Sequence, residues 1–421
     1  MTSIDIRHGD CLEVLRSLPD NSVDSVTTDP PYGLSNTKPA QVADVLAAWV
    51  TGDTEAVPAK KGGFMGANWD SFVPPPAVWV ECLRVLKPGG HMAVFAGART
   101  QDLMGLSIRL AGFEIRDTLG WIQGAGFPKS MDISKAIDKA AGAEREPGTP
   151  GRYAARRPRA DVKAVSAYQD GVGSASSALV TSPVTDAARQ WSGWGTALKP
   201  AIEPIILARK PLDGTVANNV LAHGVGGLNI DACRVGTEVR VNPPGSTNPR
   251  VAMGDGWNED ATPTVAVGRF PANVLLDEHA AKEMDKQSGV SKSPTGLITQ
   301  GGDHFSIGSE EKTRGTKFQG HGDSGGASRF FPVFKYQAKA PKKERPVIER
   351  EDGSKVQHPT VKPVALMEWL VTLITPEGGT TLDPFAGTGT TLQAARDKGF
   401  NAIGVEQDED YIQLIEQRLS A

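Results

Sequence analysis

The segment Thr380–Glu406, "TTLDPFAGTGTTLQAARDKGFNAIGVE", constrains the fold of this chain more than any other segment. It reads as an apolar strand, a glycine-rich turn, a helix and a second strand that ends in an acid. Two strands joined by a helix form a βαβ unit, and such units build parallel sheets with right-handed crossovers. The flanking stretches "ALMEWLVTLI" and "DYIQLIEQRL" have the pattern of amphipathic helices. The C-terminal part therefore predicts α/β structure.

The N-terminal part has the same alternation. Ser3–Arg7 and Val23–Thr28 read as strands, and Cys11–Ser17 reads as a short amphipathic helix between them. A polar, glycine-containing connection follows over residues 34–67. Beyond it we expect a helix at Ala77–Leu86 that "KPGG" stops, a strand in "HMAVFAG", a helix at Thr100–Ala111 and a strand at Ile115–Ile122. Both ends of the chain thus predict compact α/β structure.

The middle of the chain lacks this regularity. Periodicity fades over residues 124–192, where Lys129–Lys163 holds nine Lys or Arg against five Asp or Glu. "EPIILARKP", Glu203–Pro211, restores a strand pattern, and a Gly/Ser/Asn/Pro-rich region follows, whose composition predicts loops or segments that a partner orders. We therefore divide the chain into a first α/β part (1–123), a basic insertion (124–195), a returning strand (196–212), a loop-rich region (213–355) and a second α/β part (356–421).

Composition limits the class of protein. The 421 residues are enough for more than one structural unit, and a formal net charge of −4 means that any nucleic-acid surface has to be local. The three cysteines, Cys11, Cys82 and Cys233, lie far apart, which fits a reducing compartment without structural disulfides. No His/Cys cluster has the spacing of metal ligands, which argues against a metal site. The chain shows neither a signal-peptide pattern nor an apolar stretch of membrane-span length, so we expect a cytoplasmic protein without membrane contact.

The glycine turn of the C-terminal part has the features of a cofactor site. Gly387 and Gly389 allow a tight turn and close backbone approach, and Glu406 follows at the end of the next strand, where a carboxylate can accept hydrogen bonds from ribose hydroxyls. A phosphate-binding P-loop would need a lysine that is absent, and a dinucleotide site would want a third glycine. A turn that only packs the helix remains an alternative. The flanking acids Asp383 and Glu406 favour a nucleoside-type cofactor without a pyrophosphate.

Three motifs in order carry a family resemblance. "DPPYG" at the N-terminus, "HPTVKP" at His358–Pro363 and "LDPFAGTGTT" together resemble the β group of amino-group DNA methyltransferases, and about half of the chain, at its two ends, shares in this resemblance. Members of this family transfer a methyl group from S-adenosylmethionine to adenine N6 or cytosine N4. The resemblance implies a circularly permuted Rossmann-like domain, with a mostly parallel sheet, helices on both faces and a loop-rich central insertion. It also implies that 1–123 and 356–421 are the two parts of the catalytic domain, to which the strand at 196–212 returns, and that 213–355 is the DNA target-recognition region.

The resemblance also assigns catalytic roles. Asp29 and the carbonyl of Pro30 would accept hydrogen bonds from the target amine, and the fixed φ angles of Pro30 and Pro31 would hold that carbonyl. Tyr32 would stack on a base that has been flipped out of the duplex. The plainer interpretation is a strand-ending turn with a packed tyrosine. Asp at the first position goes more often with adenine than with cytosine, so adenine N6 is the expected target and cytosine N4 the alternative.

The cofactor contacts implied by the resemblance are spread over three segments. Asp10, with the Cys11 backbone, would hold the adenine of the cofactor, although Asp10 is also placed to cap the following helix. Glu406 would hold the ribose, Lys362 could pair with the cofactor carboxylate, and His358 would fix its turn. The methionine end would lie among Asp29, Thr360, Asp383, Phe385, Ala386, Gly387, Thr388, Gly389 and Thr390. No metal is expected.

Double-stranded DNA is the expected partner. Local basic segments offer phosphate contacts, represented by Arg156, Arg157, Arg159, Lys342 and Lys343, although such runs are often plain solvated surface. An RNA methyltransferase and an inactive DNA-binding relative are the remaining alternatives. A homodimer and a partner restriction endonuclease are compatible with the resemblance, but no feature of the sequence implies either. The target sequence cannot be read from the chain.

Overall fold

The computed structural model describes residues 2–35, 37–58, 70–124, 130–145, 181–242, 264–293, 295–299, 317–334, 346–350, 353–356 and 361–420. The chain divides into two compact units. Unit 1 comprises Met1–Ala59, Phe72–Gly124 and Ile202–Ala421, and unit 2 comprises Lys60–Ser71 and Ala125–Ala201. The two ends of the chain therefore fold together in unit 1.

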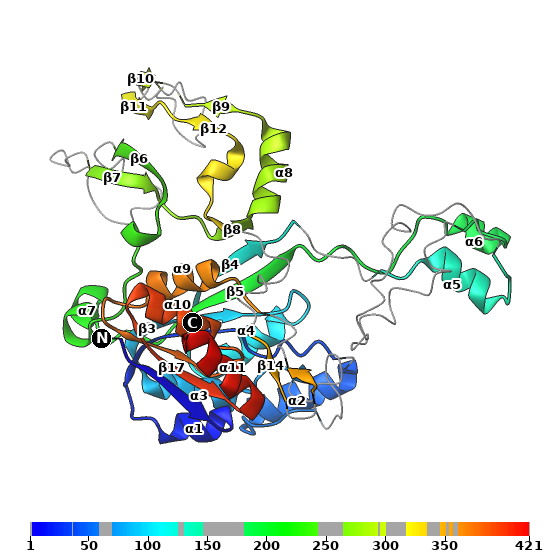
Figure 1. Cartoon of the computed structure of the whole chain (residues 1–421), viewed down its shortest axis with the longest axis horizontal. Coiled ribbons are helices and arrows are strands. Elements are labelled where there is room, and N and C mark those ends of the chain that lie inside the picture. Colours follow the sequence, from blue (N-terminus) through cyan, green and yellow to red (C-terminus); the bar gives the residue numbers. More distant parts are fainter. Residues whose placement is uncertain are drawn as a thin grey trace, which may run out of the picture. The chain divides into compact units, whose positions relative to one another are not determined.

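A nine-stranded sheet is the frame of unit 1 (Figure 1). Its strands are β1 (Ile4–His8), β2 (Val23–Thr28), β3 (Leu86–Phe95), β4 (Glu114–Ile122), β5 (Ile202–Arg209), β8 (Val274–Asp277), β13 (Val333–Phe334), β16 (Thr380–Asp383) and β17 (Asn401–Glu406). Their order is β1-β17-β16-β2-β3-β5-β4-β8-β13. Strand β5 runs antiparallel to β3 and β4, and the other neighbours are parallel. The sheet is therefore mostly parallel, as the fold class predicts.

The remaining elements surround this sheet or belong to unit 2. The helices of unit 1 are α1 (Cys11–Ser17), α2 (Pro39–Thr51), α3 (Pro76–Val85), α4 (Gln101–Leu110), α7 (Val216–His223), α8 (Glu278–Ser288), α9 (Val364–Ile374), α10 (Thr390–Lys398) and α11 (Glu409–Ser420), with short η4 (Asp231–Cys233) and η5 (Ala327–Phe330). Unit 2 contains α5 (Ile133–Ala140) and α6 (Asp186–Gln190). Two-stranded ladders pair β6 (Val235–Asn242) with β7 (Thr264–Arg269), β9 (Ser291–Lys292) with β12 (Ser324–Gly325), β10 (Thr295–Thr299) with β11 (Lys317–His321), and β14 (Ile348–Glu349) with β15 (Lys355–Val356).

Helices cover both faces of the sheet (Figure 1), and strand β3 shows how the sequence divides between them. Its alternate residues Met92 and Val94 pack with α1, α3 and α4 on one face, and Ala93 and Phe95 pack with α9 on the other. All four side chains are fully buried, because a central strand has apolar neighbours on both sides. This arrangement confirms the predicted fold class.

Three segments differ from the sequence predictions. The connection expected at 34–67 contains helix α2, whose Val45 and Trp49 are one turn apart and buried in the core. Strand β3 starts at Leu86 and includes "KPGG", five residues before the predicted strand. A bulge permits this, because Gly89 has φ +77° and an added Cβ would lie 2.3 Å from Asn219 Nδ2. Strands β8 and β13, from the region predicted as loops, extend the main sheet.

Candidate active site at the carboxyl edge of the sheet

Three neighbouring parallel strands end at the same edge of the sheet. Strand β17 ends at Glu406, β16 at Asp383 and β2 at Thr28, directly before Asp29. Strand β5 runs in the opposite direction, so its second residue, Glu203, pairs with Trp121 near the end of β4 and lies at this edge too. Ligands of open α/β sheets bind beyond the carboxyl ends of the strands. The sequence-predicted catalytic and cofactor motifs, which are separated by more than 350 residues, thus come together here.

Asp29 is held by a closed set of hydrogen bonds. Its Oδ1 accepts from the Tyr32 hydroxyl at 2.8 Å, and its Oδ2 accepts from Lys362 Nζ at 2.8 Å. The same ammonium donates to the Tyr32 oxygen at 2.9 Å and lies 3.2 Å from Glu203 Oε2. Each carboxylate oxygen can accept two hydrogen bonds, so among the described residues both oxygens of Asp29 keep capacity for a further donor. A fixed carboxylate with free acceptor sites can bind an amine.

Burial and charge set the protonation states of this group. Burial alone lowers the pKa of Lys362, but the carboxylates of Asp29 and Glu203 more than offset it, so the pKa is raised and the amine stays cationic. Burial, followed by the charges of Asp29 and Glu203, raises the pKa of Tyr32 well above its usual value. Tyr32 therefore stays a neutral hydrogen-bond donor. The ammonium also lies 4.8 Å from the centre of the Phe95 ring, a cation–π contact that supports its buried position.

The turn after β2 is fixed independently of these side chains. The hydroxyl of Thr100 donates to the carbonyl of Tyr32 at 2.6 Å, and Pro30 is buried. Gly33 has φ +65°, and an added Cβ would lie 2.7 Å from the nitrogen of Val73. Glycine is therefore required directly after the D-P-P-Y residues. The Tyr32 ring is partly buried, and its predicted stacking on a base remains a prediction.

The glycine turn after β16 has the expected shape. Gly387 and Gly389 both have left-handed φ angles, +54° and +76°. The Glu406 carboxylate accepts from the backbone nitrogens of Gly387 at 2.8 Å, Gln407 at 2.9 Å and Asp408 at 2.9 Å, so it ties the turn to the end of β17. An added Cβ on Gly389 would lie 2.9 Å from Ile415 Cγ2, so at this glycine the close neighbour is helix α11. The turn thus packs the helix, and it also leaves acceptor capacity on Glu406.

Asp383 lies beneath this turn and is almost completely buried. Its carboxylate accepts from the hydroxyls of Thr28 at 2.6 Å and Thr391 at 2.5 Å and from the nitrogen of Phe385 at 3.1 Å. Burial outweighs these bonds and raises the pKa of Asp383 to about 6. These contacts connect the strand that precedes Asp29 to the glycine turn. The predicted contact of Asp383 with the methionine end of a cofactor remains a prediction.

Asp10 caps helix α1 as its sequence position suggests. Its Oδ1 accepts from the nitrogens of Leu12 at 2.9 Å and Glu13 at 3.3 Å. Burial, followed by the charge of Asp10, raises the pKa of the Cys11 thiol to about 12, so this cysteine is not a nucleophile. The adenine contact predicted for Asp10 and Cys11 is compatible with the cap, because Asp10 Oδ2 is not used in it.

Several predicted residues lie outside the described part of the chain. These are His358, Thr360, Arg156, Arg157, Arg159, Lys342 and Lys343. Within the described ranges, no group of three or more His, Cys, Asp or Glu side chains is placed to hold a metal ion. Within the same ranges, no helix has both the length and the apolar character needed to cross a bilayer.

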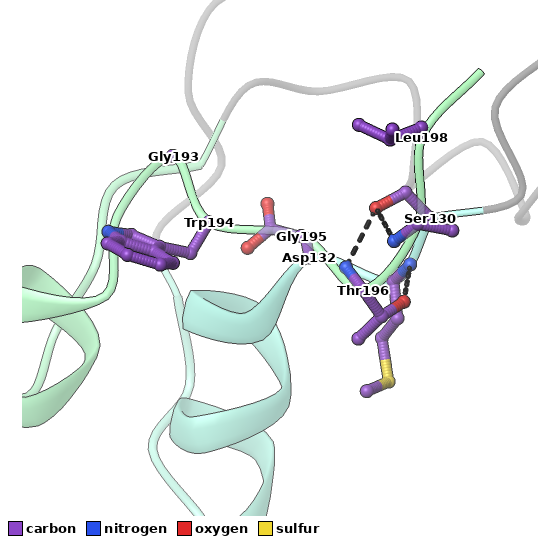
Figure 2. A pocket seen from close by; sticks show the side chains of 9 residues that line it. Ser130, Asp132, Gly193, Trp194, Gly195, Thr196 and Leu198 are labelled. Atoms are coloured by element: carbon purple, nitrogen blue, oxygen red, sulfur yellow. Dashed lines mark hydrogen bonds between the residues drawn. The ribbon is translucent and has the colours of Figure 1, made fainter.

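Unit 2 has a cavity of its own, of about 660 Å³, which Figure 2 shows. Ser130 Oγ accepts from the nitrogen of Thr196 at 3.0 Å, and Thr196 Oγ1 accepts from the nitrogen of Met131 at 2.9 Å. Asp132, the titratable residue of the lining, caps helix α5 through the nitrogen of Lys135. The polar groups of this cavity therefore stabilise its own walls, and we assign no chemistry to it.

Sequence reasoning missed four contributors to the site: Thr28, Gln123, Glu203 and Thr391. Thr28 and Thr391 bind Asp383, and Gln123 Nε2 donates to Glu203 Oε1 at 2.6 Å. The segment "EPIILARKP" gave a signal for Glu203, because an acid opens an otherwise apolar strand. Its partners Tyr32 and Lys362 are 171 and 159 residues away along the chain, which no local pattern shows.

Comparison with known proteins agrees with this geometry. Residues 252–417 match the family model described as DNA methylase, N6_N4_Mtase. The match includes the glycine turn and Glu406, and it begins after Asp29. It confirms the predicted resemblance to N6-adenine and N4-cytosine DNA methyltransferases. The D-P-P-Y residues lie outside this match, so their catalytic role remains a prediction.

Three proteins with sequence similarity to this chain are type II methyltransferases. M2.DpnII of Streptococcus pneumoniae is 40% identical over 65 residues, M.ScaI of Streptomyces caespitosus 37% over 73, and M.HinfI of Haemophilus influenzae 42% over 77. These alignments cover 15%, 17% and 18% of this chain. The chain spans only 24%, 24% and 21% of the length of these relatives.

Solved structures of DNA methyltransferases also align with the chain. The cytosine-N4-specific PvuII DNA methyltransferase has a TM-score of 0.41 at 13% identity, over 99% of this chain and 87% of its own. The M1.HpyAVI–SAM complex has a TM-score of 0.37 at 14% identity, over 99% of both chains.

Proposed function

We propose that this chain is a DNA methyltransferase that uses S-adenosylmethionine to methylate an exocyclic amine, adenine N6, in double-stranded DNA. The observation that carries the proposal is the carboxylate of Asp29, fixed by Tyr32 and Lys362 at the sheet edge where the glycine turn ends β16. An exocyclic amine needs acceptors that hold its two hydrogens, because its lone pair is delocalised into the ring. Asp29 and the carbonyl of Pro30 would provide two such acceptors.

The residues at the edge fit the proposed cofactor. Glu406 accepts three backbone hydrogen bonds, and a carboxylate has about four acceptor sites, so capacity for a ribose hydroxyl remains. Asp10, at the end of β1 beside β17, has an oxygen free of its cap for an adenine amine. When bound, S-adenosylmethionine supplies an electrophilic methyl group. The turn Phe385–Thr390 would hold its methionine end, between Glu406 and Asp29.

The remaining chemistry belongs to the chain itself. Asp29 and Pro30 would orient the amine so that its lone pair leaves the plane of the ring, and positioning is the main contribution to the rate. Tyr32 would stack on the target base, which has to leave the duplex to reach Asp29. The proton that the methylated amine loses would pass to water at the open edge. None of these roles needs a metal ion.

Parallel transfer assays test the proposal. Purified chain is incubated with S-adenosylmethionine labelled in the methyl group and with DNA, RNA or protein, and the label on each is counted. We expect label on DNA alone, and a loss of at least about 100-fold for Asp29→Ala, because positioning contributes strongly to such a reaction. Glu416→Gln, which removes an exposed carboxylate on α11, is the matched control and should transfer normally. Label on RNA alone, or label that survives Asp29→Ala, would contradict the proposal.

A further inference from the structure

The carboxylate of Glu203 is the part of the Asp29 network that the proposed mechanism leaves unexplained. Glu203 is the second residue of β5 and is followed by buried apolar residues up to Ala208, and its side chain is 31% exposed. Its Oε1 accepts from Gln123 Nε2 at 2.6 Å, and its Oε2 lies 3.2 Å from Lys362 Nζ. The Tyr32 hydroxyl is 3.4 Å from the same oxygen. Glu203 therefore joins the end of β4 to the buried ammonium.

The hydrogen bonds of Lys362 show what this carboxylate does. An ammonium has three donors, and in the part of the chain that the structure describes three acceptors surround this one: Asp29 Oδ2, the Tyr32 oxygen and Glu203 Oε2. The side chain of Lys362 is only 12% exposed, so little water is available to replace a lost acceptor. Removing Glu203 would leave one donor unsatisfied and would release the ammonium from one side.

Charge at the site supports the same role. Two carboxylates, Asp29 and Glu203, share one cation, Lys362, which leaves the group with one negative charge. If Lys362 faced Asp29 alone, the pair that receives the target amine would carry no net charge. Positive charge develops on the amine nitrogen when it takes up a methyl group, and a net negative group beside it favours that change. Glu203 thus helps to fix the ammonium that holds Asp29 and keeps the net charge of the group negative.

We propose that Glu203, itself oriented by Gln123, is a positioning residue that acts on Asp29 through Lys362. This inference rests on the proposed function, because it assigns Glu203 to the methyl-transfer step. It predicts that Glu203 affects turnover and leaves the binding of the cofactor almost unchanged. It also predicts that Glu203 has little effect once Lys362 is gone.

Steady-state kinetics of methyl transfer to DNA test this role with Glu203→Gln, Glu203→Asp, Lys362→Met and the double variant Glu203→Gln/Lys362→Met. We expect Glu203→Gln, which keeps an acceptor oxygen for Lys362 but removes the negative charge, to lower kcat about 10- to 100-fold, with KM for S-adenosylmethionine within about twofold. Glu203→Asp, which keeps the charge, should recover part of the loss. In the Lys362→Met background the Glu203→Gln change should alter kcat less than about threefold, because coupled residues are not additive.

The control is Glu114→Gln. Glu114 is a carboxylate on β4 that pairs with Arg209 of β5 at 2.6 Å, so it links the same two strands at their other end. Its kcat should equal that of the unchanged chain. A Glu203→Gln variant that turns over at the control rate would overturn the positioning role, as would a full effect that persists without Lys362. An unchanged chain that transfers no methyl group at all would instead overturn the proposed function, which separates the two failures.

Discussion

Replacing Asp383 by Asn should stabilise the protein increasingly as the pH rises through about 6. Burial raises the pKa of Asp383 from 3.8 to about 6, despite hydrogen bonds from Thr28 and Thr391. A raised pKa means that the folded chain holds the proton more tightly than the unfolded chain does. The stability associated with this carboxyl is therefore complete below its unfolded pKa of 3.8 and is lost as the pH rises through its folded pKa of about 6.

The size of the effect follows from the shift. About two pKa units at about 1.4 kcal/mol each correspond to a loss on the order of 3 kcal/mol between about pH 4 and pH 8. Asparagine carries no charge, so Asp383→Asn does not suffer this loss. Its amide can still accept from Thr28 and Phe385 through the carbonyl oxygen, and the Thr391 hydroxyl can turn to accept from the nitrogen.

Urea unfolding at a series of pH values, followed by tryptophan fluorescence, measures this difference. The free energy of unfolding of Asp383→Asn minus that of the unchanged chain should increase by about 3 kcal/mol from pH 4 to pH 8. Glu416→Gln makes the same charge change on an exposed site and should show a small, flat difference. A difference for Asp383→Asn that is independent of pH, or that falls as the pH rises, would refute the reasoning.

Two further predictions concern the turns that frame the site. Gly389→Ala should lower the free energy of unfolding by at least about 1–2 kcal/mol, because Gly389 has φ +76° and an added Cβ would lie 2.9 Å from Ile415 Cγ2. Denaturation of this variant with and without Ile415→Ala separates the backbone strain from the contact with Ile415. Equal stability of Gly389→Ala and the unchanged chain would contradict both causes. Asp10→Ala should lower the free energy of unfolding by about 1 kcal/mol, because helix α1 loses its cap, and Asp10→Ser should restore most of this stability. Equal melting temperatures of the Ala and Ser variants in a thermal unfolding scan would exclude the cap as the cause.

Local sequence patterns predict the elements that carry the site. Helix α1 and strand β2 have the predicted boundaries, Cys11–Ser17 and Val23–Thr28, because their apolar residues recur at helical spacing or run continuously through a buried strand. The apolar residues of "PAQVADVLAAWVT" also recur at helical spacing, which is why the segment forms α2. The polar, glycine-containing residues around it led to the prediction of a loop. Strand β13 has only two residues, too few for any periodicity.

Tertiary contacts decide what the local patterns could not predict. The residues of "KPGG" are typical helix and strand breakers, yet they lie within β3, because the sheet and the Asn219 side chain accept a bulge there. The acceptors of Lys362 are a second case. The sequence predicted a cofactor carboxylate as its partner, whereas the structure surrounds it with Asp29, Tyr32 and Glu203 from distant segments. The cofactor contact of Lys362 remains a prediction.

The central claim is that Asp29 holds an adenine amine for methylation, and the modified base tests it most directly. DNA from cells that express the chain or its Asp29→Ala variant would be digested to nucleosides and measured by mass spectrometry. The account predicts N6-methyladenine in DNA from cells with the unchanged chain and background levels with Asp29→Ala. N4-methylcytosine in place of N6-methyladenine would contradict the choice of base. Equal N6-methyladenine with both chains, or no methylated base with either, would contradict the claim itself.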